Sequence, residues 1–435
     1  MHVALDLKDS LGHPREPSTV SGMARGMMGS GILKVAAEIR DRVAKGQKVC
    51  NLTVGDFSPK EFPIPTELRD LIGEALRAGE TNYPPADGMP ELRQAVQRLY
   101  ARSLGLHYPL ESIVIASGAR PIVYGTYRCV VDPGDVVVYP VPSWNNNYYV
   151  EILGAKGAPV ATHVEQGFMP TAEQIRPLLP QARFLCLGSP LNPTGTMFAA
   201  EQLKAVCEAL VEENAGRKHA GRPPVIVMYD QIYWALTFGA AKHVTPVGLV
   251  PEMAPYTVFV DGISKAFAAT GLRVGWGVGP PSIISRMKDL IGHTGAWAPR
   301  PEQVASARFL DAGAPMERYL TEMRRGVDAR LETLHQGLME LRKRGLPVSD
   351  TAPQGAIYLS VRFDLIGRKG IRNNEDIRKL LLERAGFAVV PFQAFGLEEE
   401  TGWFRCSVGA VSEAEIREVL PRVEAALRSV VDAAA

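Results

Sequence analysis

Short apolar runs that alternate with helical patterns constrain the fold of this chain more than any other feature. The runs are Ile113–Ala116, Val136–Tyr139, Phe184–Leu187, Val225–Met228 and Thr257–Val260. Helical patterns such as Glu201–Glu213 and Pro281–Ile291 separate most of them. Buried strands that alternate with helices form βαβ units, so the pattern predicts an α/β fold with a mostly parallel sheet covered by helices on both faces. Ligands bind beyond the carboxyl ends of the strands in such sheets, so candidate site residues should follow these runs directly.

The C-terminal part of the chain has a different pattern. It is helical from Pro301 through Arg344. A strand, a helix, a strand and a closing helix then follow, at Ala356–Val361, Asn374–Ala385, Trp403–Val408 and Glu413–Val431. This order predicts a smaller α+β domain. The polar, glycine-bearing segments 213–224 and 366–376 are predicted to be solvated loops rather than anion-binding patches.

The N-terminal part begins with about twenty polar, proline-bearing residues, which are typical of a loose arm. Amphipathic helices are predicted at Ile32–Val43, Glu67–Ala78 and Glu91–Ser103. We therefore divide the chain into residues 1–61 (the arm and part of a small domain), 62–305 (a large domain) and 306–435 (the rest of the small domain). The small domain would then be built from both chain ends.

Composition excludes several classes of partner. Lysine and arginine number 48 against 47 aspartates and glutamates, so no bulk charge attracts nucleic acid or an anionic membrane. No apolar run approaches the roughly 18 residues of a membrane span, and the N-terminus lacks the pattern of a secretory signal. The five cysteines show no paired spacing, which argues against disulfides or a metal site. We expect a soluble, cytoplasmic protein.

The segment from Val260 to Gly277 is rich in small residues and starts at a strand end, so its backbone can approach a ligand closely. Lys265 lies within it, and a partly desolvated lysine there would become a nucleophile able to form an imine. Arg273 follows eight residues later and could pair with a phosphate. Taken alone, Lys265 could equally be in a surface loop.

Two further strand ends carry polar groups that suit a protonated pyridine ring. Asp230 ends one strand; by itself it could be a simple helix cap. With Tyr233 three residues later, the carboxylate could hold a proton on a ring nitrogen while the hydroxyl reaches the ring's phenolic oxygen. Asn192, in the turn GSPLNPTG, could donate to the same oxygen, although the segment could be an ordinary turn.

A phosphate cradle and a stacking surface are also indicated. Gly118, Ala119 and Arg120 form a strand-to-helix turn whose backbone amides suit a phosphate. Trp144 follows another strand and could stack on a planar ring or belong to the core.

Together, SKAFAATGLRVGW, SPLNPTGT, YDQIY and TNYPPADGMPELR resemble the class I/II aminotransferases, which are fold-type I pyridoxal-phosphate enzymes, and are most similar to the aspartate aminotransferase-like branch. The resemblance extends from about Ile32 to the C-terminus. It implies pyridoxal 5'-phosphate as cofactor, with no metal. Lys265 would be the Schiff-base lysine and would shuttle the substrate proton, Asp230 would pair with the pyridinium, and Tyr233 and Asn192 would contact the phenolate. The residues implied at the stacking position and around the phosphate are Trp144, Ser264, Arg273, Gly118 and the amides of Ala119 and Arg120.

The resemblance also implies residues beyond the cofactor. Arg405 would bind the substrate α-carboxylate, which the Gly55 backbone would also contact; Trp144 and Asn192 would line the substrate as well. Tyr83 would reach the phosphate of a neighbouring subunit's cofactor, so a homodimer with shared sites is implied. Gly262 stands where many members carry a phosphate-binding serine, which removes one donor.

Substrate side-chain specificity is left open by the segment 293–300. Arg300 could bind a second carboxylate or lie on the surface, and His293 and Trp297 could form an aromatic pocket.

The function implied is transfer of an amino group from an L-amino acid, of aspartate or glutamate type, to a 2-oxo acid by a ping-pong mechanism. An aminotransferase for aromatic or other amino acids is one alternative, and a lyase or synthase on the same fold is another, because the fold does not separate these reactions. A regulatory protein on a degenerate fold is disfavoured, since the residues that would carry out the chemistry are all present.

Overall fold

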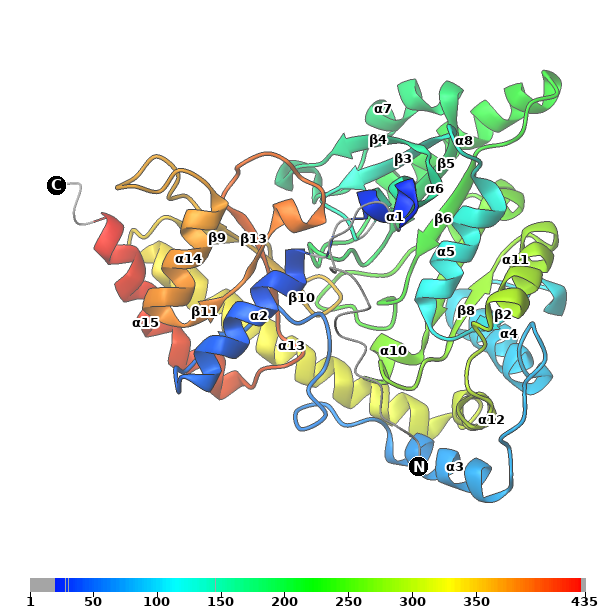
Figure 1. Cartoon of the computed structure of the whole chain (residues 1–435), viewed down its shortest axis with the longest axis horizontal. Helices are drawn as coiled ribbons and strands as arrows, with labels where there is room; N and C mark the ends of the chain where they lie inside the picture. The colour runs from blue at the N-terminus through cyan, green and yellow to red at the C-terminus, as the bar shows by residue number, and fades with distance from the viewer. Residues whose placement is uncertain (1–19, 28, 30, 145, 432–435) are drawn as a thin grey trace, which may run out of the picture.

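The computed structural model describes residues 20–27, 29, 31–144 and 146–431. The N-terminal arm predicted over the first residues therefore lies mostly outside the described part. The helices are α1 (Gly22–Gly26), α2 (Gly31–Ala44), α3 (Thr66–Arg77), α4 (Pro90–Leu104), α5 (Ala119–Val130), α6 (Asn146–Leu153), α7 (Ala172–Ile175), α8 (Ala200–His219), α9 (Pro246–Leu249), α10 (Ile263–Ala266), α11 (Pro281–Thr294), α12 (Arg300–Leu310), α13 (Ala314–Lys343), α14 (Asn374–Ala385) and α15 (Glu413–Val431). Figure 1 shows their arrangement.

A seven-stranded sheet forms the centre of the larger part, in the order β2-β8-β7-β6-β5-β3-β4. Its strands are β2 (Ile113–Ala116), β3 (Val136–Val141), β4 (Lys156–Ala161), β5 (Ala182–Gly188), β6 (Ile226–Asp230), β7 (Thr257–Gly262) and β8 (Gly275–Val278). Only β8 pairs antiparallel, with β2 on one side and β7 on the other. The mostly parallel sheet predicted from the sequence is confirmed.

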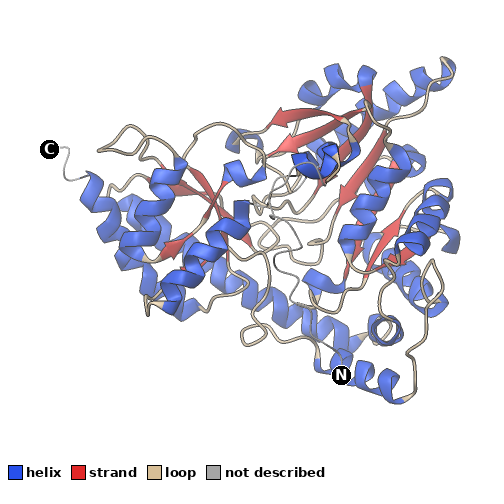
Figure 2. Ribbon diagram, viewed as in Figure 1, coloured by secondary structure: helices blue, strands red, loops and turns tan. Residues whose placement is uncertain are grey.

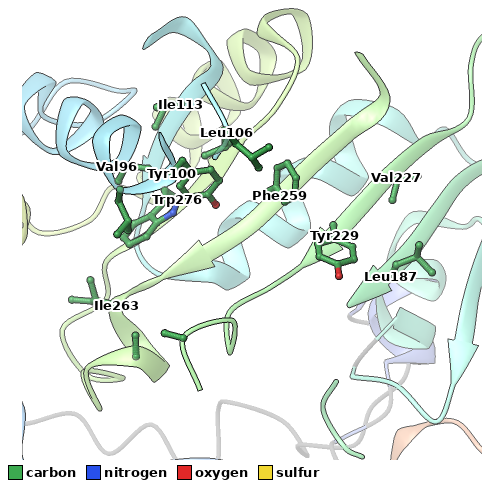
Figure 3. Packing of buried hydrophobic residues seen from close by; sticks show 14 of the residues in the cluster. Val96, Tyr100, Leu106, Ile113, Leu187, Val227, Tyr229, Phe259, Ile263 and Trp276 are labelled. Carbon is green, nitrogen blue, oxygen red and sulfur yellow. The ribbon is translucent and has the colours of Figure 1, made fainter. Parts of the chain in front are cut away.

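Helices cover both faces of this sheet, as Figure 2 shows. Alternate residues of one strand point to opposite faces, so Val227 and Tyr229 enter one apolar cluster while Ile226 and Met228 enter another. The first cluster includes residues of α4, α8 and α12, and the second includes residues of α5 and α11. Figure 3 shows Tyr229 and Phe259 of the sheet in the first cluster, with Tyr100 and Trp276. The two layers hold the carboxyl ends of the strands in fixed positions.

A smaller α+β part has its own sheet and its own core. Four antiparallel strands pair in the order β12-β13-β10-β9, with β9 at Val348–Asp350, β10 at Tyr358–Phe363, β12 at Val390–Pro391 and β13 at Trp403–Ser407. A second, two-stranded sheet joins β1 (Cys50–Asn51) to β11 (Phe387–Ala388) in parallel. The core of this part combines Cys50, Leu52 and Phe57 with residues of α13, α14 and α15. Both chain ends therefore contribute to it, as predicted.

The helix α13 belongs to both parts and is drawn in yellow in Figure 1. Its residues Met316 and Leu320 pack in the large core, whereas Met323 and those beyond pack in the small core. The predicted boundary between residues 305 and 306 falls inside α12, and the three-part division stays a prediction.

Three details differ from the sequence-based expectations. Residues 213–224 are not all loop, because α8 continues to His219 and buries Asn214 and Arg217. The Arg217 guanidinium pairs with Glu213 and donates to the Leu179 carbonyl, which holds this last stretch in the helix. The strands β1, β4, β8, β9, β11 and β12 were not expected. The long helical stretch is broken into α12 and α13 at residues 311–313. Within the described residues, no helix is both long and apolar enough to cross a lipid bilayer.

Candidate active site

A cavity of about 560 Å³ lies at the carboxyl ends of the central strands and extends to the small sheet. Most of the residues singled out in the sequence line it: Gly55, Ala119, Arg120, Trp144, Asn192, Asp230, Tyr233, Ser264, Lys265, Arg273 and Arg405. They come from segments spread over more than 300 positions of the chain. The fold therefore brings these residues to one place.

Lys265 stands on the short helix α10, directly after β7. Its Nζ donates to the Gly55 carbonyl oxygen at 2.7 Å and lies 5.8 Å from the centre of the Tyr233 ring. Burial lowers the pKa of Lys265 to about 8, and the neighbouring arginines push it the same way while Asp56 opposes them. A substantial fraction of the amine is therefore neutral, and hence nucleophilic, near neutral pH.

Asp230 ends β6 and faces the same cavity. One carboxylate oxygen accepts from the Ile232 backbone N–H at 3.1 Å. Burial raises the pKa of Asp230 to about 6, although that hydrogen bond and the charge of Lys265 lower it. A buried carboxylate of this kind favours a ligand that brings a positive charge or a proton.

Tyr233 lies beyond β6, and its hydroxyl is 2.5 Å from the hydroxyl of Tyr358, the first residue of β10. Both side chains are buried. The hydrogen bond joins the two parts of the molecule at the cavity. The sequence analysis did not single out Tyr358.

The turn between β2 and α5 forms the predicted anion cradle. Gly118 has φ of +89°, and a Cβ there would lie 2.2 Å from Arg273 Nη2. The Arg273 guanidinium donates to the carbonyl oxygens of Thr270, at 2.6 Å, and Ser117, at 3.0 Å. The helix α5 begins at Ala119, so its first amides and a guanidinium meet at one end of the cavity.

Arg405, on β13, is a buried cation without a counter-ion. It forms no ion pair with a carboxylate in the described part of the chain, and its Nε has no hydrogen-bond partner there. Its other nitrogens donate to Asn192 Oδ1 at 3.0 Å and to the Thr53 carbonyl at 2.6 Å. The guanidinium lies between the rings of Tyr358 and Phe395, at 4.8 and 4.9 Å from their centres. Because an uncompensated buried charge is costly, the site favours an anionic ligand.

Arg120 and Trp144 form another wall of the cavity. The Arg120 guanidinium lies 5.4 Å from the centre of the Trp144 ring, and Trp144 also contacts Phe395. Arg120 likewise has no ion pair with a carboxylate among the residues whose positions are described. Lys265, Arg120, Arg273 and Arg405 thus face the cavity, against the carboxylates of Asp56 and Asp230.

Gly118 does not line this cavity, and neither do Tyr83, His293, Trp297 and Arg300. Tyr83 is 80% exposed and packs on Trp297, with ring centres 5.1 Å apart. Arg300 pairs with Glu80, with Nε 2.5 Å from a carboxylate oxygen, and is neither free nor fully on the surface. His293 is exposed, so within one chain it builds no aromatic pocket with Trp297.

Sequence reasoning missed Tyr358, Asp56 and Cys186, which also line the cavity. Asp56 accepts from the Thr270 hydroxyl at 2.7 Å, and Cys186 contacts the Tyr127 hydroxyl at 3.1 Å. None of the three lies in a recognisable motif. Asp56 directly follows Gly55, and this position next to a predicted site residue was its only sequence signal.

Comparison with known proteins places this geometry in a family. The sequence profile described as "Aminotransferase class I and II" matches residues 47–423. The chain belongs to this family. An aspartate aminotransferase of Rhizobium meliloti is 32% identical over 92% of this chain and 94% of its own length.

Solved structures of the family superpose on almost the whole chain. The crystal structure of the aspartate aminotransferase from Rhizobium meliloti has a TM-score of 0.85 at 30% identity, covering 94% of this chain and 99% of that one. The aspartate aminotransferase from Thermus thermophilus with maleate has a TM-score of 0.83 at 27% identity, with the same coverage. The fold-type I architecture expected from the resemblance is confirmed.

Members of this family depend on pyridoxal phosphate, and the residues of this cavity fit that group. Because Gly118 has no Cβ, the Arg273 guanidinium can lie against the turn that begins α5, where a Cβ would be 2.2 Å from Nη2. The buried Lys265 amine has a lowered pKa, and the Asp230 carboxylate has no cationic side chain as hydrogen-bond partner among the described residues. An amine for an aldehyde, a carboxylate for a pyridinium and a cradle for a phosphate are thus present in one cavity.

Proposed function

We propose that this chain is a pyridoxal-phosphate-dependent aminotransferase that moves an amino group from an L-amino acid to a 2-oxo acid in two half-reactions. The observation that carries the proposal is the buried Lys265 amine, with its pKa of about 8, in a cavity whose three arginines have no carboxylate partner within the described part of the chain. A cation-rich cavity with one nucleophilic amine suits a phosphate, a carboxylate and a carbonyl group together.

Each part of the cofactor has a group suited to hold it. The amides of Gly118, Ala119 and Arg120, with Ser264 and Arg273, would bind the phosphate. Asp230 would pair with the ring nitrogen, Tyr233 and Asn192 would donate to the phenolic oxygen, and Trp144 would stack on the ring. When bound, pyridoxal phosphate supplies an electron sink that makes the α-proton of an attached amino acid acidic.

The protein's own groups then perform positioning and proton transfer. Arg405 would bind the α-carboxylate bidentately, with the Gly55 backbone beside it, and so fix which bond at the α-carbon is labile. Lys265 Nζ would accept the proton from the substrate α-carbon, since a pKa near 8 suits a general base at neutral pH.

We propose a dicarboxylic amino acid, aspartate or glutamate, as the donor. Arg273 at the cradle and Arg405 beside Gly55 account for a phosphate and an α-carboxylate. Arg120 is a third guanidinium facing the same cavity, and it too has no carboxylate partner among residues 20–27, 29, 31–144 and 146–431, which suits a side-chain carboxylate. The relatives support this proposal, because they are aspartate aminotransferases and the structure of the Thermus thermophilus enzyme was solved with maleate, a dicarboxylate.

We also propose a homodimer with shared sites. Tyr83 exposes 80% of its surface although it is aromatic, and it packs on Trp297 rather than entering the cavity of its own chain. In the proposed dimer, this exposed side chain would reach the phosphate bound by the neighbouring subunit. The five free thiols support a reducing, cytoplasmic location.

The test is the absorption spectrum of the cofactor-loaded protein as single amino acids are added without an oxo acid. We expect the visible band to be replaced by that of the amino form of the cofactor with aspartate or glutamate, and far less with phenylalanine or alanine. A preference for phenylalanine would indicate an aromatic aminotransferase. A band that changes without giving the amino form would instead indicate a lyase or synthase and contradict the proposal.

A further inference from the structure

We propose that Tyr358 is a positioning residue that sets the hydrogen-bonding strength of Tyr233 toward the cofactor. The inference rests on the proposed function and adds to it a residue that no sequence motif marks. Tyr358 itself would touch neither the cofactor's ring oxygen nor the reacting carbon. It would act through the Tyr233 hydroxyl.

The geometry of the pair is fixed from both sides. Tyr358 is 1% exposed and begins β10, where it pairs with Ser407 of β13. Tyr233 is 4% exposed and follows β6 of the large sheet. Their rings meet edge to face with centres 5.5 Å apart, and their hydroxyl oxygens are 2.5 Å apart. A contact this short between two buried side chains, one in the turn after β6 and one on β10, leaves little freedom for either hydroxyl.

The direction of this hydrogen bond follows from the number of protons. Each hydroxyl has one proton to donate. If Tyr233 donates its proton to the phenolic oxygen of the cofactor, the 2.5 Å contact must be donated by Tyr358. A donor that itself accepts a hydrogen bond becomes a stronger donor, because hydrogen bonds in a chain polarise one another. Tyr358 would therefore strengthen the bond from Tyr233 to the cofactor.

Charged groups face the pair from several elements. They are Arg405 on β13, Asp230 at the end of β6, Asp56 in the N-terminal segment and Lys265 on α10. A phenylalanine at position 358 leaves every one of these in place and removes one hydroxyl. It also keeps an aromatic ring under the Arg405 guanidinium, which lies 4.8 Å from the Tyr358 ring.

The experiment is a pH titration of the visible absorbance of the cofactor-loaded protein. The variants are Tyr358→Phe, Tyr233→Phe and the double variant. Tyr229→Phe is the matched control, because Tyr229 is fully buried, donates to the Val244 carbonyl and does not line the cavity. Thermal unfolding of each loaded protein checks that it is folded.

We expect Tyr358→Phe to raise the pKa of this titration by roughly 0.1–0.3, because neighbouring hydrogen bonds strengthen each other by about 10–30% and loss of the whole Tyr233 bond is worth about one unit. A weaker bond from Tyr233 leaves more negative charge on the phenolic oxygen, and that charge retains the proton on the neighbouring nitrogen. Tyr233→Phe should raise it by about one unit or more. Adding Tyr358→Phe to Tyr233→Phe should not change this pKa further, because Tyr358 is proposed to act only on the Tyr233 hydroxyl.

Two results would overturn the inference alone: a Tyr358→Phe titration identical to that of the unmodified protein, or an equal shift on the Tyr233→Phe background. A shift of the same size in Tyr229→Phe would also overturn it, because any buried tyrosine would then suffice. An unmodified protein that develops no visible band with pyridoxal phosphate would overturn the proposed function and this inference together.

A second variant, Tyr358→Leu, should give the same pKa shift and in addition raise the KM for the amino donor, because it removes the ring beside Arg405. A Tyr358→Leu titration without that shift would count against the inference.

Discussion

Lys265 Nζ donates a 2.7 Å hydrogen bond to the carbonyl oxygen of Gly55, a residue 210 positions earlier in the chain. A Cβ on Gly55 would lie 3.5 Å from Arg405 Nη1, so the amine, this carbonyl and the buried guanidinium are close neighbours. The bond therefore holds the lysine on the side of the cavity where a substrate carboxylate would bind. The proposed mechanism needs the Lys265 amine and the Arg405 guanidinium close together, because one takes the α-proton and the other binds the α-carboxylate of the same substrate.

The lowered pKa of Lys265 predicts how fast the apoprotein captures pyridoxal phosphate. The neutral amine attacks the aldehyde, and its fraction rises about tenfold per pH unit until the pKa of about 8 is passed. Stopped-flow absorbance should therefore show capture that accelerates from pH 6 to 8 and levels off above it. Lys265→Ala should show no covalent capture and no turnover, while still retaining some phosphate-held cofactor. A rate that levels off only near pH 10 would mean that the amine is solvated.

Arg405→Lys is expected to raise the KM for the amino donor by about 10- to 100-fold, because one ammonium cannot replace a bidentate guanidinium. The affinity for pyridoxal phosphate should stay within about twofold, since the α-carboxylate subsite is separate from the cradle. Steady-state kinetics and a cofactor titration measure the two quantities. An unchanged KM would contradict the assignment.

Arg120→Gln removes the third guanidinium and keeps the backbone amide of the cradle. We expect kcat/KM for aspartate to fall about 10- to 100-fold, with little change for alanine or phenylalanine. Arg344→Gln is the matched control, because Arg344 pairs with Glu424 far from the cavity. Equal losses for aspartate and alanine would assign Arg120 to the cofactor rather than to the substrate side chain.

Gly118→Ala should weaken the binding of pyridoxal phosphate by about tenfold or more, because its Cβ would displace the Arg273 guanidinium. Gly134→Ala separates this effect from backbone strain. Gly134 has φ of +90°, nearly the same as Gly118, but a Cβ there would meet nothing within 4 Å. Both variants should lose about 1–2 kcal/mol of stability from the left-handed backbone, and only the first should lose cofactor affinity. Equal affinities of Gly118→Ala and Gly134→Ala for pyridoxal phosphate would contradict the phosphate cradle at Gly118.

Hydrophobic patterns predicted most of the fold, and each of the two strands that they missed in the large sheet has a physical reason. The strand β8 has glycines at positions 275 and 277, where a Cβ would lie 2.4 Å from the backbone of Gly118 and 2.9 Å from Ile122. The close approach of α5 requires glycine, and glycine weakens the strand pattern. The other strand missed in the large sheet, β4, lies at its edge and contains Pro159.

The candidate site was predictable wherever a motif marked it, as at Lys265 and Asp230. Tyr358 was not predictable, since it meets Tyr233 from 125 positions away, on a strand of the small sheet. Sequence spacing carries no information about a contact of that kind. The absence of an ion pair at Arg405 likewise depends on the packed structure.

The pairing of β1 with β11 determines when the small core can form during synthesis. Residues 50–51 bind residues 387–388, so about 336 residues must leave the ribosome after the first strand before its partner exists. At roughly 5–20 residues per second this takes about 17–70 s. For that time Leu52 and Phe57, which end up buried, have no native neighbours from the C-terminal half. A newly made chain must therefore keep its N-terminal apolar residues from aggregating until translation is nearly complete.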